Sequence, residues 1–247
     1  MDTTLVAYVI TCLLIALGPA LCGRYLFHST RRFLWLGAAT MVVSSLIGGL
    51  VGGFAGGFLD GLASATRDVP RGGSPESHSL TYFVLTATTT GIFEEAGRLF
   101  STRRLVGRPS ARFTLSDALM FGAGFGGAEA VFRAGGAALA FALSPMKADG
   151  SFELSSIGAD PLYPIAYASI AAFHITMSVI AAHMLRAGRV SPFYILVLLA
   201  TYHGAANAGA VMFVRSLADP DLTTLMWLVI AIANSLLCFG LFRGLNT

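Results

Sequence analysis

Charged residues are few in this sequence: they make up 12% of its 247 residues, whereas hydrophobic residues make up 55%. Such a composition excludes an ordinary water-soluble domain. The net charge of +3 comes without a basic stripe along the chain, so we expect no nucleic-acid partner. The composition predicts instead a single transmembrane domain over residues 1–247, surrounded by the lipid bilayer.

Cysteine is also scarce, and its three residues lie in or beside apolar stretches without the spacing of metal ligands: Cys12, Cys22 and Cys238. Their number and placement exclude a disulfide framework and give no sign of redox chemistry. The His-Glu-x-x-His motif of many zinc proteases is absent as well. Because the N-terminus lacks a positive region and a clear cleavage site, we expect the first apolar run to be retained.

Apolar stretches long enough to cross a hydrocarbon core of about 30 Å recur along the whole chain. They predict an all-α, polytopic membrane helix bundle with about seven transmembrane helices, at residues 4–22, 33–58, 80–100, 114–142, 162–185, 191–214 and 222–242. In the second of these, Gly48, Gly52 and Gly56 share one face. Small residues at this spacing let helix backbones approach closely in lipid, so we interpret them as a packing face.

The loops between these spans differ in charge. One alternate set carries ten basic residues and one acid, Asp117, whereas the other carries four basic and nine acidic residues. Because cytoplasmic loops are enriched in Lys and Arg, the N-terminus is expected outside and the C-terminus inside. The protein is therefore predicted to be a multi-pass protein of the cell membrane, in a bacterium the inner membrane.

Glu94 and Glu95 lie side by side within the apolar stretch 80–100. Charges at the bilayer centre cost about 2.5–3.5 kcal/mol each on insertion scales, so they usually mark a functional site. Three later spans carry polar groups at similar depth, counted at about 1.5 Å per residue: Glu129, His174, and His203 with Asn207. We expect these side chains to converge on one site.

Each of these residues also has a structural interpretation. Arg98 follows Glu94 by four residues and Arg133 follows Glu129 by four, so both acids could form intrahelical ion pairs. A single His or Asn in a membrane helix commonly forms a hydrogen bond to a neighbouring helix. The coincidence of three carboxylates and two histidines at one depth favours a functional site over separate packing solutions.

The residue types indicate hydrolysis. A buried carboxylate can serve as general base and acid for a water molecule, and His203 and Asn207, one turn apart, can donate hydrogen bonds to an oxyanion. Together these groups describe peptide-bond cleavage without a covalent intermediate, and no cofactor is expected. The alternative is zinc held by His174, His203 and a Glu, which would leave one coordination position open.

The motifs resemble those of a known superfamily. Glu94-Glu95-x-x-Arg98, a glycine-rich helix and His203-x-x-x-Asn207 are similar to the CAAX prenyl endopeptidases and bacteriocin-processing proteins, also called abortive-infection proteins. These are intramembrane glutamic proteases. The run Gly122-Ala123-Gly124-Phe125-Gly126-Gly127-Ala128-Glu129-Ala130 makes the YhfC-type membrane peptidases the most similar group. The resemblance covers about residues 80–210, which we expect to form the catalytic core helices.

The resemblance implies that Glu94 or Glu95 activates water, that His203 and Asn207 stabilise the oxyanion, and that Arg98 orders the acidic pair. Two departures from the prenyl-protease pattern leave roles open. The acidic motif is one residue shorter, so either glutamate could be the base. The pattern Phe-x-x-x-His is Phe125-x-x-x-Glu129 here, so the water-holding group could be Glu129, His174 or both.

We therefore expect an intramembrane endopeptidase, glutamic rather than zinc-dependent, that cuts a membrane protein or a membrane-anchored peptide. Two other classes remain open. Intramembrane Glu and His residues also form proton relays, which would suit a proton- or ion-coupled transporter. A catalytically silent membrane scaffold is the third possibility.

Overall fold

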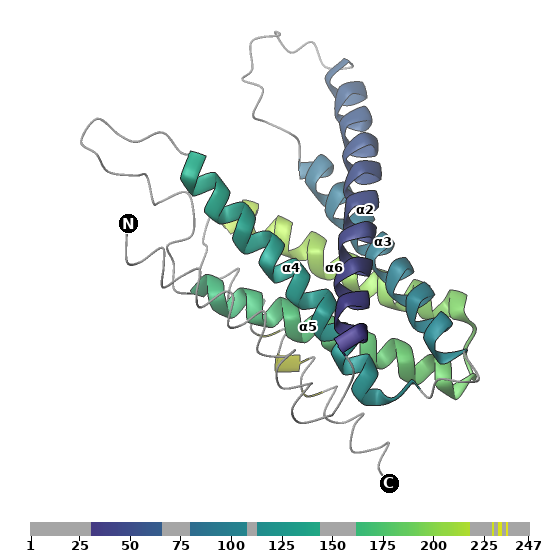
Figure 1. Ribbon diagram of the computed structural model, residues 1–247. Coiled ribbons are helices and arrows are strands. Elements are labelled where there is room, and N and C mark those ends of the chain that lie inside the picture. Colours follow the sequence, from purple (N-terminus) through teal and green to yellow (C-terminus); the bar gives the residue numbers. More distant parts are fainter. Residues whose placement is uncertain are drawn as a thin grey trace.

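The computed structural model of the chain describes residues 31–65, 80–107, 113–143 and 162–217, together with positions 229, 232, 233 and 236. Long α-helices make up nearly all of this part, and it holds no strand. The helices are α2 (Arg31–Ala65), α3 (Leu80–Val106), α4 (Leu115–Leu143), α5 (Leu162–Ala187) and α6 (Pro192–Leu217), and Figure 1 shows their arrangement. The all-α prediction is confirmed for the described residues.

Five of the predicted spans coincide with α2 to α6, and most of their ends agree with the helix ends to within a few residues. The span at 4–22 lies outside the described residues, as does most of the span at 222–242, of which four described positions are helical. Within the described residues, two segments are long and apolar enough by composition to cross a membrane, Arg31–Leu59 and Ile170–Ala187. The count of seven and the N-out orientation therefore stay predictions.

Local sequence signals explain three of the helix ends. At the start of α4, Asp117 accepts a hydrogen bond from the backbone N–H of Thr114 (2.7 Å), and the Thr114 hydroxyl accepts one from the Asp117 N–H (3.2 Å). This reciprocal arrangement is a capping box. α5 ends at Ala187, and the next residue, Gly188, has a φ of 62° in the left-handed region that suits glycine. α6 begins at Pro192, because proline fits the first turn of a helix.

The described helices form one connected bundle that includes α3 in its centre. α3 contacts α2, α5 and α6, while α4 contacts α2 and α5, as the crossing of α2 over α4 in Figure 1 illustrates. Phe33 of α2 packs edge-on against Phe113, just before α4, with ring centroids 5.3 Å apart. The same hydrophobic cluster includes Val106 and Ala182, so the start of α2, the end of α3, the start of α4 and the end of α5 lie together.

Glycines lie where the backbones of neighbouring helices approach each other most closely. A Cβ added at Gly48 would lie 2.8 Å from the Cα of Thr90, and one at Gly52 would lie 2.9 Å from the Cα of Thr86. The predicted packing face of the second span is thus confirmed, with α3 as its partner. α2 meets α4 more closely still, because a Cβ at Gly124 would overlap the carbonyl oxygen of Leu34.

The interior of the bundle is more polar than part of its surface. Several large apolar side chains are mostly exposed, among them Phe54 at 80% and Leu50 at 74%. In contrast, Glu95 and Arg98 are fully buried. Apolar side chains outside and ionisable side chains inside are the distribution expected for helices surrounded by lipid.

Gly124→Ala should destabilise the fold, because the added methyl group would displace α2 from α4. Overpacking typically costs about 1–3 kcal/mol, so we expect a clearly lower thermal unfolding midpoint in detergent. Gly49→Ala is the matched control, since nothing lies within 4 Å of a Cβ added there. Equal midpoints for the two variants would contradict the proposed role of the α2–α4 contact.

Candidate active site

The ionisable side chains predicted to converge do so. Glu94 and Glu95 come from α3, Glu129 from α4, His174 from α5 and His203 from α6, and all five are buried. The ring centroids of the two histidines are 5.2 Å apart. These five residues and Arg98 are called the polar cluster below. The sequence predicted that these residues lie at a similar depth along four separate helices, and in the structure their side chains meet.

Arg98 forms the centre of the polar cluster. Its Nε donates to the Glu95 carboxylate at 3.0 Å, three residues earlier on α3. Its terminal nitrogens donate to the His174 carbonyl oxygen at 2.9 Å and to the Ser178 hydroxyl on α5. The guanidinium also lies 4.1 Å from the ring centroid of Phe125 on α4, a cation–π contact. One side chain thus connects α3, α4 and α5.

His203 is held between the two adjacent glutamates. Its Nδ1 lies 2.8 Å from Glu95 Oε1, and because a carboxylate only accepts, Nδ1 carries the hydrogen. Its Nε2 lies 3.4 Å from Glu94 Oε2, which is long for a hydrogen bond. In neutral His203, Nε2 presents its lone pair to this carboxylate, an arrangement that suits a proton or a metal ion between the two atoms.

His174 is bonded through both ring nitrogens. Arg98 donates to Nδ1 at 2.5 Å, since a guanidinium has no acceptor. The neutral ring therefore carries its hydrogen on Nε2, which faces Glu129 Oε2. Phe125 packs against the same imidazole with ring centroids 4.9 Å apart. These contacts fix both the orientation and the tautomer of His174.

Ser45 of α2 also reaches the polar cluster, although no motif in the sequence singles it out. Its hydroxyl donates to Glu94 Oε1 at 2.6 Å. A serine in a membrane helix usually bonds to a carbonyl of its own helix, as the neighbouring Ser44 does to Thr40. Ser178 was missed in the same way, although it lies one turn after His174 and so shares its helix face.

Two predicted residues are not among the members of the polar cluster, Asn207 and Arg133. Asn207, one turn after His203, is partly buried against α3, where its Nδ2 lies 3.4 Å from the carbonyl oxygen of Ala87. The side chain of Arg133 lies outside the described residues, so its pairing with Glu129 stays a prediction. The spacing suggested an intrahelical pair of Arg98 with Glu94, whereas the carboxylate that contacts its Nε belongs to Glu95.

Three members of the polar cluster could hold a metal ion. The ligand atoms offered by Glu94, His174 and His203 all lie within 4.8 Å of one another. Two ligands at about 2.1 Å from a tetrahedral ion are about 3.4 Å apart, which matches the spacing of His203 Nε2 and Glu94 Oε2. The Glu95 carboxylate on Nδ1 is the outer partner that metal-bound histidines usually have. The His203–Glu94 spacing therefore fits zinc, whereas His174 would first have to release a ring nitrogen from Arg98 or Glu129.

A groove of about 510 Å³ runs along the seam between α3 and α6, close to the polar cluster. Its wall includes Gly204, the residue directly after His203. The lining is mostly apolar and small: Thr88, Ile92, Leu196, Val197, Ala200, Thr201, Gly204, Ala205 and Ala208. An extended or helical segment in this groove would lie next to the helix face that carries His203.

Replacing Arg98 by Met should strongly destabilise the protein, because the buried Glu95 carboxylate would lose its cation. Breaking one side of a buried ion pair costs about 3–5 kcal/mol, so the thermal unfolding midpoint in detergent should fall sharply. Arg104→Met is the control, since Arg104 is exposed beside Phe100. A similarly small decrease of the unfolding midpoint in both variants would contradict the central role of Arg98.

A comparison with known protein families identifies the family of this chain. A family model described as YhfC intramembrane metalloprotease matches residues 11–232, which include all of the polar cluster. No curated protein and no solved structure matches the chain. The resemblance to the YhfC-type peptidases is thereby confirmed, and the chain belongs to the YhfC intramembrane metalloprotease family.

Proposed function

We propose that this protein is an intramembrane endopeptidase that hydrolyses a peptide bond of a membrane protein at the polar cluster. The observation that carries the proposal is His203, with Nδ1 on Glu95 and Nε2 facing Glu94 across 3.4 Å. Such a pair can hold a metal ion or position a proton. The family match favours proteolysis over the transporter and the silent scaffold.

Glu94, His174 and His203 would hold a divalent cation, with zinc as the natural choice for a His₂Glu set. A bound zinc ion makes water nucleophilic near neutral pH and polarises the scissile carbonyl. His203 would bind through Nε2. His174 could bind only after its bonds rearrange, because Arg98 occupies Nδ1 and Nε2 carries the hydrogen that faces Glu129. This replaces our expectation that no cofactor is needed.

The chain's other residues would orient the ligands and move the proton. Glu95 holds the His203 ring through Nδ1, and Arg98 holds Glu95 in turn. Glu129, beside His174, is the carboxylate that we assign to accept the proton of the attacking water and to pass it to the leaving amine. Asn207 would place the scissile carbonyl, since its amide is one turn from His203.

A metal-free reaction is the second candidate, because the Arg98 guanidinium lies 2.5 Å from His174 Nδ1. A cation so close weakens the attraction of His174 for a metal ion. In this glutamic mechanism, Glu94 or Glu95 would take the proton of the water directly, and His203 and Asn207 would stabilise the oxyanion. The two mechanisms use the same side chains and differ in their response to chelators.

The substrate segment would lie in the α3–α6 groove, within the membrane or at its edge. The small side chains there let a peptide backbone approach α6 closely. We propose a multi-pass protein of the cell membrane, in a bacterium the inner membrane, with the N-terminus outside. Residues 80–210 would supply the ionisable side chains, and Ser45 of α2 would support Glu94 from outside that range.

His203→Ala and Glu94→Gln should each abolish proteolysis. The experiment compares membrane-protein N-termini, identified by mass spectrometry, in cells that express the unaltered chain or a variant at equal level. The abundance of new N-termini within or beside membrane segments should be at least about 100-fold lower in cells with a variant than in cells with the unaltered chain. Loss of a catalytic group has effects of that size, about 100-fold or more. In purified protein, a zinc chelator should abolish cleavage and added zinc should restore it.

The matched control is Arg104→Gln, since Arg104 is exposed at the end of α3 and lies outside the polar cluster. It should leave the pattern of new N-termini unchanged. If His203→Ala and Glu94→Gln kept the pattern as well, the protein would not be a protease. If cleavage by the purified protein persisted at full rate in chelator, the glutamic mechanism would replace the zinc mechanism.

Ser45→Ala should lower the turnover number about tenfold, because a hydrogen bond to a charged group contributes about 1.5–3 kcal/mol and Ser45 orients Glu94. Ser44→Ala should have little effect, since the Ser44 hydroxyl bonds to carbonyl oxygens of its own helix, those of Thr40 and Met41. The measurement is cleavage of an identified substrate in liposomes. Equal rates for the two variants would show that Ser45 has no positioning role.

A further inference from the structure

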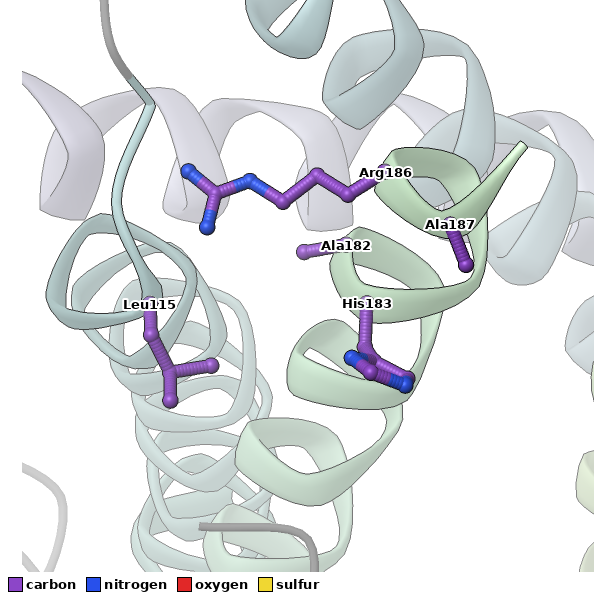
Figure 2. Close-up of a pocket in the computed structure, with 5 residues that line it drawn as sticks. All are labelled: Leu115, Ala182, His183, Arg186 and Ala187. Atoms are coloured by element: carbon purple, nitrogen blue, oxygen red, sulfur yellow. The ribbon is translucent and has the colours of Figure 1, made fainter. Parts of the chain in front are cut away.

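A small cavity opens between the start of α4 and the end of α5. It has a volume of about 250 Å³ and is lined by Leu115, Ala182, His183, Arg186 and Ala187. Figure 2 shows the Arg186 side chain leaving α5 and extending toward α4, so that its guanidinium lies over the space between the two helices. The cavity is therefore apolar in its walls and cationic at its rim.

This end of the bundle is strongly basic. Six arginines of the described residues lie there, at the start of α2, the end of α3, and in or directly after the last turn of α5: Arg31, Arg32, Arg103, Arg104, Arg186 and Arg189. Among the described residues, the acidic side chain at this end is Asp117, which accepts hydrogen bonds from Thr114 as the cap of α4. An anion at this end would meet a large excess of positive charge.

Arg186 differs from the other arginines in its surroundings. Arg32 and Arg104 lie over the rings of Phe33 and Phe100, at 4.6 and 4.2 Å from the centroids. Arg186 has no ion-pair partner within the described residues and lines the cavity together with His183, one turn earlier on α5. A guanidinium and an imidazole around one cavity supply several hydrogen-bond donors for a single anion.

We propose that this cavity binds the phosphate of an anionic phospholipid, with Arg186 as its main ligand and His183 as a second donor. The site lies on α4 and α5 and is separate from the polar cluster, so the proposal goes beyond the peptidase function. Basic pockets between membrane helices at the cytoplasmic side are typical sites for anionic headgroups.

The size and walls of the cavity favour a lipid over free phosphate. A volume of about 250 Å³ equals that of roughly eight water molecules at about 30 Å³ each. A phosphodiester with part of its glycerol fits this space, whereas the acyl chains must remain outside, along the apolar helix surfaces. Leu115, Ala182 and Ala187 supply an apolar wall that a freely soluble phosphate ion would not use.

The proposal is tested by lipid binding to the purified full-length chain in neutral detergent, measured by native mass spectrometry. Dioleoyl phosphatidylglycerol should bind at least about tenfold more tightly than dioleoyl phosphatidylcholine. Arg186→Gln should weaken phosphatidylglycerol binding about fivefold or more, the effect of losing about 1 kcal/mol per basic residue. Arg186→Lys should retain most of the binding, which separates loss of charge from misfolding.

Arg104→Gln is the matched control, because it removes the same charge from the same end of the bundle without touching the cavity. It should leave phosphatidylglycerol binding within about twofold of the unaltered chain. Equal weakening by both glutamine variants would overturn the proposal in favour of unspecific charge attraction. Competition by inorganic phosphate or glycerol phosphate at concentrations similar to the lipid's would overturn the assignment to a membrane lipid.

Discussion

Arg98 lies fully buried among helices that face lipid, and the rest of the site depends on how its charge is neutralised. An unpaired ion in such an interior costs several kcal/mol, so the guanidinium requires the Glu95 carboxylate on its own helix. It also draws the His174 carbonyl and the Ser178 hydroxyl of α5 towards it. Glu95 in turn fixes His203 of α6. One ion pair therefore sets the relative positions of both histidines.

Close backbone contacts supply the framework for this network. Gly124 lets α4 approach α2 so closely that no side chain fits between them, and Gly48 and Gly52 do the same for α2 and α3. Because α2 lies against α3, Ser45 can reach Glu94. Packing of small residues replaces the hydrophobic effect as the force that joins helices in lipid, and here it also brings a hydroxyl to the polar cluster.

Much of this arrangement could be predicted from the sequence, because lipid thickness limits where polar groups can lie. The lengths of the apolar stretches predicted the approximate positions of α2 to α6. The number of residues from the start of each span predicted that Glu94, Glu129, His174 and His203 would lie at one depth and meet. Depth does not give the rotation of each helix about its axis, so the sequence could not distinguish the roles of Glu94 and Glu95. Ser45 could not be found, since a lone serine in an apolar helix usually bonds to its own backbone.

We propose that Glu95 and Arg98 hold His203 so that its Nε2 and Glu94 form half of a metal site. X-ray absorption at the zinc edge of the purified, zinc-loaded chain measures this most directly. We predict one ion per chain with nitrogen and oxygen ligands at about 2.0–2.2 Å, two imidazoles among them, and a changed ligand shell in the His203→Ala variant. Less than stoichiometric zinc, or an identical spectrum in that variant, would contradict the claim.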